Sequence, residues 1–508
     1  MTAIFDQGAH PPCPAPFNLA DYVLRAGQET PDKIALAVLS LSGAERWSYA
    51  RLTQAVRGAA TGLLAQGATP GDRVLLRLSN TVAFPIAYLA AIAADLIPVP
   101  TSALLTTPEV DKIVAEVAPR LMIQADDVAA PSGALATIDA DTLLSFVDCD
   151  PAPFRLGDPN RPAYIVYTSG TSGQPRAVTH AHRAIWARRM MWDGWYGMTA
   201  QDRMLHAGAF NWTYTLGTGL LDPWTLGATA LIPAPGVRSA QLPLLIKRHD
   251  ATIVAAAPGV YRQMLHQPIP PLPKLRHGLS AGEKLPDVTR HRWIEATGTA
   301  LHEAFGMSEC STFVSGAPAR PAPAGTLGHP QIGRRVAILD AADQPLPLGE
   351  PGTLGISTDD PGLMLGYWNR GDGAPDPVQG AWFRTGDTMA MGTDGALTYL
   401  GRADDMMNAG GFRVSPIEVE SAFNAHPDIR ECAAVEQRVS DETSLIALYY
   451  VAGAEIDTAA LTAFAADRLA RYKAPRIFQR IDALPKGGNG KLNRRALRQL
   501  KEADLGQA

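Results

Sequence analysis

A run of hydroxyl and glycine residues at 167–178, YTSGTSGQPRAV, overlaps the end of the apolar segment 164–167. Glycine lets the backbone approach a ligand closely, and backbone N–H groups and hydroxyls that point the same way can surround a phosphate. The GxxxxGK[ST] pattern of the common P-loop is absent. The segment predicts a phosphate-binding loop, and a solvated turn of the same composition is the alternative. The residues predicted to bind are Thr168, Ser169, Gly170, Thr171, Ser172, Gly173 and the cationic Arg176.

Four further segments rich in glycine or charged residues follow in order: GMSE at 306–309, FRTGD at 383–387, GRADDMMNAGGFRVSP at 401–416 and PKGGNGK at 485–491. With the phosphate loop they resemble the adenylate-forming enzymes, the superfamily of acyl- and aryl-CoA ligases, luciferases and peptide-synthetase adenylation domains. Among these the chain looks most similar to benzoate-type acid–CoA ligases. The resemblance covers the chain from about residue 20 to about residue 500. It depends on the order of all five motifs, because each alone is weak.

The resemblance implies that the chain binds ATP with Mg²⁺. It gives Glu309 the role of holding Mg²⁺ against the phosphates, and Mg²⁺ prefers carboxylate oxygens. It implies that Phe305 stacks on adenine, although relatives usually have tyrosine at this position. It also implies that Asp387 and Arg402 bind the ribose. Alone, a loop glutamate is usually a solvated surface residue, and an RTGD segment is as readily a turn. The other residues implied to bind the nucleotide are Gly282, Glu283, Glu303, Ala304, Gly306, Met307 and Ser308.

The glycine-rich segment at 485–491 ends in a lysine. The resemblance implies that Lys491 bridges the carboxylate of an acid and the α-phosphate of ATP, since one ammonium group can neutralise two anions as they meet. It makes Lys491, Glu309 and Arg176 the catalytic residues. Arg176 and Ala177 replace the usual Lys-Gly pair, but arginine keeps the charge and can bind phosphate through two N–H groups. In isolation, 485–491 would read as a flexible basic tail.

The segment at 401–416 combines a hinge with a channel in the resemblance. Asp404 is implied to be the pivot about which a C-terminal domain rotates. Gly410, Gly411 and Phe412 are then implied to line the channel for the pantetheine arm of CoA.

The acyl pocket is implied to lie at AFNWTYTLGTG (209–219) and CSTFVSG (310–316). The AFNW segment has no acidic residue that could bind an amino group, which favours a plain carboxylic acid over an amino acid. Large aromatic residues predict a compact pocket for an aromatic or short acyl group, although both aromatics could equally be core residues. The residues implied to form the wall are Trp212, Tyr214, Ser311 and Thr312.

The elements that must position these motifs alternate between strands and helices. A helical pattern at 53–67 ends on Gly67, and the apolar residues 82–94 predict a buried helix. This alternation predicts an α/β fold in which parallel sheets are flanked by helices. Apolar runs that read as strands buried on both faces occur at 73–78, 163–167, 229–232 and 252–257.

At 508 residues the chain is too long for one hydrophobic core. We predict a large N-terminal domain at 1–403, which holds the ATP, Mg²⁺ and acyl sites. Its glycine- and proline-rich stretch at 316–380 predicts a small β-rich subdomain. Residues 404–508 predict a small, mobile α+β domain that carries the catalytic lysine.

The composition excludes several classes of protein. A net charge of −5 argues against nucleic acid as a partner. The four cysteines lie far apart and predict free thiols in a reducing compartment. The apolar run at 82–94 is shorter than the ~20 residues that a membrane span needs, and the N-terminus lacks the pattern of a secretory signal. We therefore expect a cytoplasmic protein without a membrane partner.

The chain is thus expected to be an acid–CoA ligase that forms an acyl-AMP and then a thioester. Its partners would be a small carboxylic acid, ATP and CoA, and a homodimer is left open. A ligase that loads a carrier-protein thiol shares every ATP motif and stays open as an alternative. A serine hydrolase is the third, because GLSAG at 278–282 matches the GxSxG elbow with Ser280 as nucleophile and Asp343 and His426 downstream.

Overall fold

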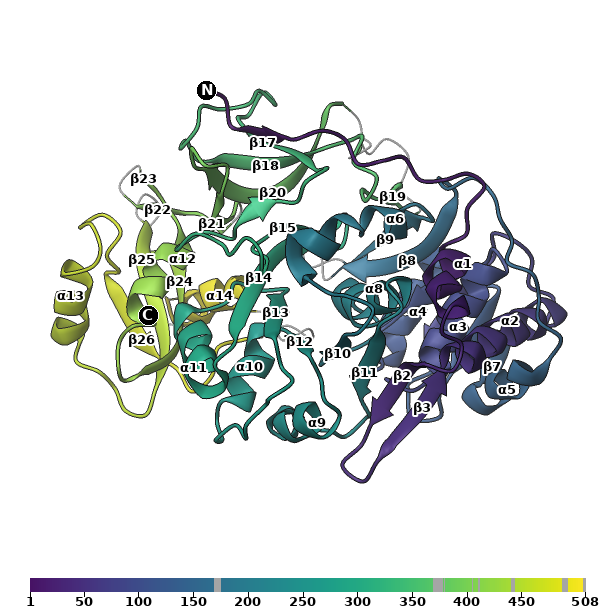
Figure 1. Cartoon of the computed structure of the whole chain (residues 1–508). Helices are drawn as coiled ribbons and strands as arrows, with labels where there is room; N and C mark the ends of the chain where they lie inside the picture. The colour runs from purple at the N-terminus through teal and green to yellow at the C-terminus, as the bar shows by residue number, and fades with distance from the viewer. Residues whose placement is uncertain are drawn as a thin grey trace.

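A nine-stranded sheet forms the centre of the N-terminal part of the chain (Figure 1). The computed structural model describes residues 1–168, 175–368, 378, 380–403, 405–409, 412–439, 444–486 and 492–505. The strands from β14 to β2 run parallel, and antiparallel strands close the two edges. In spatial order the strands are β16 (His329–Pro330), β15 (Ser311–Ser315), β14 (Ala300–Met307), β13 (His277–Ala281), β12 (Ile253–Ala256), β10 (Arg203–His206), β11 (Thr229–Pro233), β2 (Ile34–Leu39) and β3 (Ala44–Ser48).

Strand β12 shows that this sheet is buried on both faces. Val254 and Ala256 pack against three helices, whereas Ile253 and Ala255 pack with Trp195 on the opposite face. Because neither face meets water, the strand reads as a continuous apolar run. The strands predicted at 229–232 and 252–257 are confirmed. The three helices are α9 (Leu242–Arg248), α10 (Pro258–Met264) and α11 (Asp287–Thr297).

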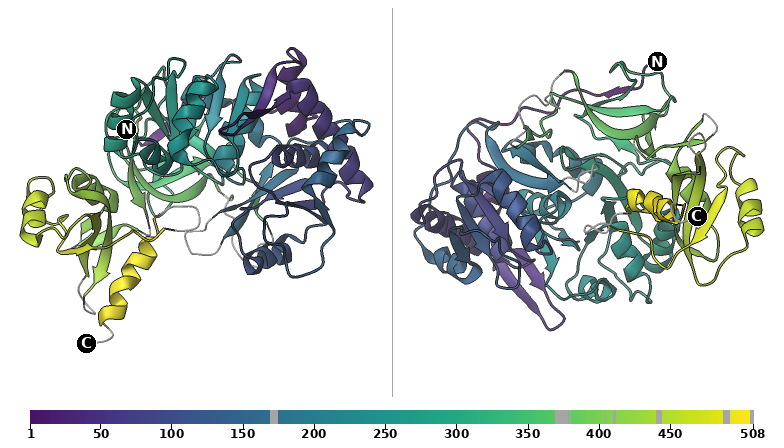
Figure 2. Two further views of the ribbon diagram at one scale, coloured as in Figure 1. Left: turned by 90° about the horizontal axis from the view of Figure 1, so that it is seen from below. Right: turned by 180° about the vertical axis from the view of Figure 1, so that it is seen from behind.

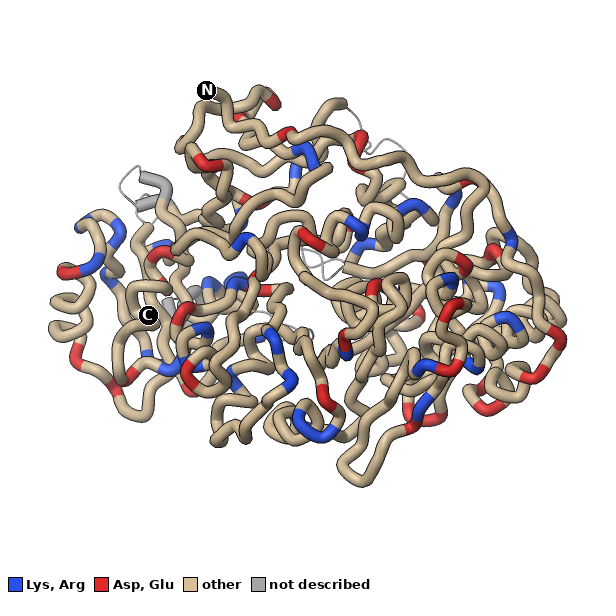
Figure 3. The backbone as a smooth tube through the Cα atoms, viewed as in Figure 1, with Lys and Arg blue, Asp and Glu red and all other residues tan. Residues whose placement is uncertain are grey.

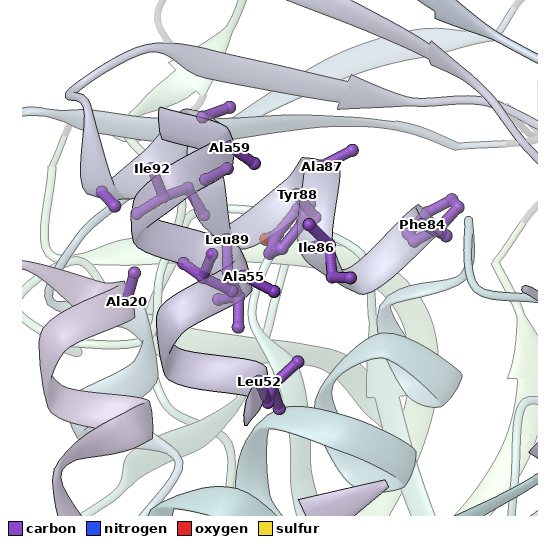
Figure 4. Packing of buried hydrophobic residues seen from close by; sticks show 14 of the residues in the cluster. Ala20, Leu52, Ala55, Ala59, Phe84, Ile86, Ala87, Tyr88, Leu89 and Ile92 are labelled. Atoms are coloured by element: carbon purple, nitrogen blue, oxygen red, sulfur yellow. The ribbon is translucent and has the colours of Figure 1, made fainter. Parts of the chain in front are cut away.

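A second parallel sheet packs with the N-terminal helices. Its strands are β5 (Ile97–Pro100), β4 (Arg73–Arg77), β6 (Leu121–Gln124) and β7 (Thr137–Asp139). Every residue of the predicted apolar helix, α3 (Ala83–Ala93), is buried (Figure 4). Helix α2 (Tyr49–Ala65) begins four residues before the predicted start, because the Ser48 hydroxyl accepts the N–H of Arg51 and caps the helix there. The remaining helices of this part are α1 (Leu19–Leu24), α4 (Thr107–Val117) and α5 (Ala140–Ser145).

Two antiparallel sheets complete the N-terminal part. The three-stranded sheet consists of β19 (Gly366–Tyr367), β9 (Arg176–Ala181) and β8 (Pro162–Thr168). The five-stranded sheet consists of β1 (Ile4–Asp6), β17 (Arg335–Leu339), β18 (Gly352–Ser357), β20 (Trp382–Met391) and β21 (Leu397–Arg402). The five-stranded sheet contains strands of the predicted β-rich stretch and adds strands from outside it at both ends.

The C-terminal part forms a small α+β lobe, which stands apart in the left view of Figure 2. Arg498 donates to Asp405 at 2.9 Å and Arg494 to Glu420 at 2.7 Å, so the last helix is bound to the start of the lobe. The predicted pivot, Asp404, lies outside the described residues. The elements of the lobe are β22 (Met407–Ala409), β23 (Phe412–Val414), α12 (Pro416–Phe423), β24 (Ile429–Arg438), β25 (Ser444–Ala452), α13 (Thr458–Ala466), β26 (Ile477–Arg480) and α14 (Arg494–Leu505). The predicted α/β class, with a large first domain and a small second one, is confirmed.

Charged residues of both signs are interspersed along the tube in Figure 3. Among the described residues, no helix combines the length and the apolar character that would let it cross a bilayer.

Candidate active site

The predicted GMSE loop is a tight turn between β14 and β15. The two strands pair in antiparallel fashion, and their register shifts between Phe305 and Gly306. A Cβ at Gly306 would lie 2.2 Å from the carbonyl oxygen of Ser311, so the turn requires glycine there. Cys310, which follows Glu309 in this turn, lies in one hydrophobic cluster with residues of the three-stranded and five-stranded sheets.

Glu309 lies in contact with the three-stranded sheet. The Tyr367 hydroxyl donates to its Oε1 at 2.9 Å, and its backbone carbonyl accepts the N–H of Met364 at 2.8 Å. The guanidinium carbon of Arg176 lies 5.1 Å from the centre of the Tyr367 ring. Burial raises the pKa of Tyr367 to about 12, so this phenol stays protonated and donates at neutral pH. The structure thus brings together Glu309 and Arg176, two residues far apart in sequence, through a tyrosine that the motifs did not indicate.

Arg176 and Thr168 form the cross-strand pair next to the loop of the β8–β9 hairpin. The predicted phosphate loop connects these two residues. Ser169, Gly170, Thr171, Ser172 and Gly173 lie outside the described residues, and their binding roles stay predictions.

The predicted ribose residues lie side by side on β20 and β21. Asp387 is directly opposite Arg402 in the strand pairing, and the Nη1–Oδ2 distance is 3.3 Å. The Tyr399 hydroxyl donates to the other carboxylate oxygen of Asp387 at 3.2 Å. Burial raises the pKa of Tyr399, so its hydroxyl is a donor here. Asp387 is 4 % exposed, and both neighbours fix its carboxylate in position.

Phe305 connects this pair to the glutamate turn. Its ring centre lies 5.6 Å from that of Tyr399 and 5.5 Å from that of Phe313. Phe305 and Met307 are only partly buried, although both pack against the core of the five-stranded sheet. Stacking of Phe305 on adenine stays a prediction.

A buried carboxylate, that of Glu303, fixes the loop after β13, which carries the predicted nucleotide-binding residues Gly282 and Glu283. Glu303 accepts the N–H of Leu285 at 2.8 Å and forms an ion pair with Arg290 at 2.9 Å. Burial raises the pKa of Glu303, and these two partners oppose that rise. Gly282 is exposed with φ +95°, a conformation that favours glycine, and Glu283 beside it is partly buried. The side chain of Glu303 therefore shapes the loop, while Ala304 next to it is buried within β14.

Two residues of the predicted acyl wall, Tyr214 and Thr312, contact the same group of buried residues. The Tyr214 hydroxyl donates to the carbonyl of Leu279 at 3.2 Å, and its ring stacks 5.8 Å from Trp195. The Thr312 hydroxyl contacts the sulfur of Met191 at 2.7 Å. Met191, Trp195 and Tyr214 belong to one hydrophobic cluster, so two wall segments distant in sequence meet here. Trp212 precedes α7 (Thr213–Leu216) and is partly buried.

A buried ion pair that the motifs did not indicate lies behind this wall. Arg188, at the end of α6 (Ala184–Ala187), pairs with Asp222, the first residue of α8 (Asp222–Thr225), at 2.6 Å. Tyr196 donates to the same carboxylate at 2.6 Å, and Arg188 also donates to Ser311. A single aspartate within the apolar segment around 222 was the available signal, because a charge in such a segment is rarely buried without a partner.

Several predicted residues of the C-terminal part cannot be placed. Lys491, Gly410 and Gly411 lie outside the described residues, and only the backbone of Phe412 is described, in β23. Their roles stay predictions.

The geometry of a serine hydrolase is absent among the described residues. Ser280 lies inside the central strand β13 and is fully buried, not on a strand-to-helix turn. Asp343 pairs with Arg384 on the five-stranded sheet, and His426 accepts the N–H of Asp428 in the C-terminal lobe. The three residues lie in different parts of the fold, namely the nine-stranded sheet, the five-stranded sheet and the C-terminal lobe. The GxSxG match therefore does not mark a triad.

Comparison with known proteins agrees with this geometry. The model of the AMP-binding enzyme family matches residues 23–368, and that of the AMP-binding enzyme C-terminal domain matches residues 418–491. A benzoate–CoA ligase of Thauera aromatica is 30% identical over 94% of this chain and 92% of its own. A 3-hydroxybenzoate–CoA ligase of Aromatoleum sp. (strain CIB) is 28% identical over 98% and 99%. The crystal structure of a benzoate CoA ligase from Burkholderia xenovorans LB400 superimposes with a TM-score of 0.83 at 28% identity, over 95% of this chain and 100% of that one.

Proposed function

The chain belongs to the AMP-binding enzyme family and is an AMP-forming acyl-CoA synthetase, and we propose that its substrate is an aromatic carboxylic acid of the benzoate type. One observation supports this most. The turn that presents Glu309 continues directly into Ser311 and Thr312 of the acyl wall. An acid held against that wall would place its carboxylate beside the proposed phosphate site.

In the first half-reaction, a carboxylate oxygen attacks the α-phosphorus of ATP and pyrophosphate leaves. Two anions must meet, so positive charge is needed around the reacting atoms. Arg176 is the described residue that would supply it, next to Tyr367 and Glu309. Lys491 is proposed to bridge the two anions.

The surroundings of Glu309 fit a magnesium ion. Mg²⁺ in phosphate-transfer sites is typically held by one or two carboxylates together with substrate phosphates. The hydrogen bond from Tyr367 to Oε1 orients the Glu309 carboxylate, which would hold the ion. A bound Mg²⁺ would neutralise phosphate charge.

Asp387 would accept hydrogen bonds from the ribose hydroxyls. Its two oxygens already contact Tyr399 and Arg402, and a carboxylate has about four lone-pair sites, so it can accept further bonds. The neighbours hold the carboxylate in one orientation before ATP arrives, which lowers the entropy lost on binding.

In the second half-reaction, the CoA thiol attacks the acyl carbonyl and AMP leaves. This step needs Lys491 withdrawn and a thiol channel opened. We propose that the lobe beginning at Asp404 rotates as a unit, and that Gly410, Gly411 and Phe412 then line the channel.

The test is to incubate the purified protein with ATP, Mg²⁺ and benzoate, with either CoA or a holo-carrier protein. We expect AMP and pyrophosphate release with benzoyl-CoA as the product. Acyl-AMP that reacts only with the holo-carrier thiol would favour the carrier-loading alternative. If no AMP forms with any aromatic acid, the proposed substrate class is wrong.

A further inference from the structure

A small recess with a mainly apolar lining and a few polar side chains lies behind the acyl wall. It is bounded by α3, the β8–β9 hairpin, α7 and the glutamate turn, and its lining includes Tyr88, His180, Arg188, Thr213, Ser308 and Ser311. About 20 Å³ is open to the centre of a water molecule, which is room for roughly one water-sized group. In the sequence, Thr213 lies between the two predicted wall aromatics, Trp212 and Tyr214, and Ser308 directly precedes Glu309. The recess therefore borders the proposed acyl site.

Tyr88 lines this recess and has an unpartnered hydroxyl. It belongs to the fully buried helix α3, among alanine, leucine and isoleucine side chains (Figure 4). Its hydroxyl is buried and has no hydrogen-bond partner among the described residues. Burial raises the pKa of Tyr88 well above its usual value, so the phenol remains protonated. Buried hydroxyls normally have a partner, so this one calls for a ligand or a water.

His180 also lines the recess and has an unpartnered acceptor. Its Nε2 lies 2.7 Å from the carbonyl oxygen of Ser308, and since a carbonyl only accepts, Nε2 must carry the proton. Burial lowers the pKa of His180 to about 4, so the ring is neutral near pH 7. Its Nδ1 therefore holds a lone pair, and this buried atom also lacks a partner among the described residues.

Arg188 does not make the recess an anion site. Its guanidinium forms three hydrogen bonds to the Asp222 carboxylate, at 2.9, 3.0 and 2.6 Å, and others to Ser311, Tyr196 and Thr218. A Cβ at Gly217 would lie 2.2 Å from its central carbon, so the group is packed closely. The positive charge is compensated, and a second carboxylate of a substrate would find no free cation here among the described residues.

Resting on the proposed function, we propose that this recess binds a hydroxyl or primary amino substituent on the ring of the aromatic acid. The substituent would donate a hydrogen to Nδ1 of His180 and accept one from the hydroxyl of Tyr88. Methoxy and fluoro groups cannot donate, and a methyl group can do neither. An acid without the substituent would leave two buried polar atoms unpaired, which is the arrangement that discriminates best between substrates.

The test compares benzoate with hydroxy-, amino-, methoxy-, fluoro- and carboxy-substituted benzoates at each ring position, by pyrophosphate release. We expect one ring position at which the hydroxy or amino acid has a kcat/KM about tenfold or more above benzoate. Methoxy, fluoro and carboxy acids at that position should show no such gain. Equal values for benzoate and its hydroxy and amino derivatives would overturn the subsite alone. No AMP release with any acid would overturn the proposed function as well.

A pair of tyrosine variants separates recognition from structure. In Tyr88→Phe, the ratio of kcat/KM for the preferred acid to that for benzoate should fall about tenfold. Its thermal unfolding midpoint should not fall, since no bond within the protein is lost. The control is Tyr49→Phe, because the buried Tyr49 hydroxyl donates to the Ala228 carbonyl at 2.6 Å. It should lower the unfolding midpoint and keep the ratio. If Tyr88→Phe changes kcat/KM for all acids by one factor, the recess holds only water and the proposal is wrong.

Discussion

On the nucleotide side of the β14–β15 turn, Tyr367 binds Glu309, and Tyr399 and Arg402 bind Asp387, so each predicted ligand is already held by neighbours. On the acyl side, Tyr88 and His180 each keep a buried polar atom without a partner among the described residues. The first region is proposed to bind ATP, which is the same for every acid. The second is incomplete without a group that the substrate brings, so selectivity between acids should reside there.

The largest effect is expected from breaking the buried ion pair behind the acyl wall. Asp222→Asn leaves the Arg188 charge buried without a counter-charge, which typically costs about 3–5 kcal/mol of unfolding free energy. Urea unfolding measures the loss. The control is Asp343→Asn, since the Asp343–Arg384 pair is exposed and should contribute at most about 1 kcal/mol. Equal losses in both variants would contradict a structural role for the buried pair.

On the nucleotide side, Glu309→Gln should reduce AMP release by about 100- to 1000-fold, because an amide cannot offset the charge of a magnesium ion. The reduction should be the same for every acid, unlike the acid-dependent effect expected at the recess. Glu295→Gln, an exposed residue on α11, serves as the control. A loss confined to some acids would place Glu309 in the acyl site instead.

Asp387→Asn should raise KM for ATP about tenfold, because hydrogen bonds to a charged acceptor contribute about 1.5–3 kcal/mol. KM for the acid should stay unchanged. Deoxy-ATP analogues provide the cross-check: they should bind more weakly than ATP to the natural protein, and the difference should shrink in the variant. A persistent difference would mean that another group binds the ribose.

The smallest effect per residue concerns acid stability. Burial lowers the pKa of His206 to about 3 and those of His180 and His302 to about 4, below the usual 6.5. Histidines that fold neutral contribute stability that is complete above the unfolded-state pKa and is lost as the pH falls toward the folded-state pKa. From about pH 7 to about pH 5.5, the unfolding free energy should drop by about 1 kcal/mol per histidine. Urea unfolding of His206→Phe should show a shallower pH slope, and an unchanged slope would contradict this origin.

The sequence indicated more of the proposed nucleotide side than of the acyl side. Arg176, Glu309, Asp387 and Arg402 lie in short motifs because turns and strand ends need particular glycines nearby, and such constraints appear locally in the sequence. Tyr367 and Tyr399 were missed, since a tyrosine that contacts a motif residue from another strand leaves no pattern of its own.

On the acyl side, the contacts of the polar side chains could not be predicted from sequence motifs. Tyr88 reads as part of the buried helix at 82–94 and Arg188 belongs to no motif, and only packing reveals which polar atoms end up without partners. Tyr214 was predicted to be a wall residue and stays a prediction, and its bond to the Leu279 carbonyl depends on strand pairing that no motif encodes. The α/β class was predictable, because alternating buried strands and helices repeat along the whole chain.

The tie between helix α14 and Asp405 has a consequence for observing motion. Because Arg498 donates to Asp405, next to the proposed pivot, helix α14 should move together with the rest of the C-terminal lobe in the proposed rotation. A donor fluorophore on α14 with its acceptor on α9 would report the position of the C-terminal lobe through the efficiency of energy transfer. The transfer efficiency should change from one value with ATP and the acid bound to another once CoA is added.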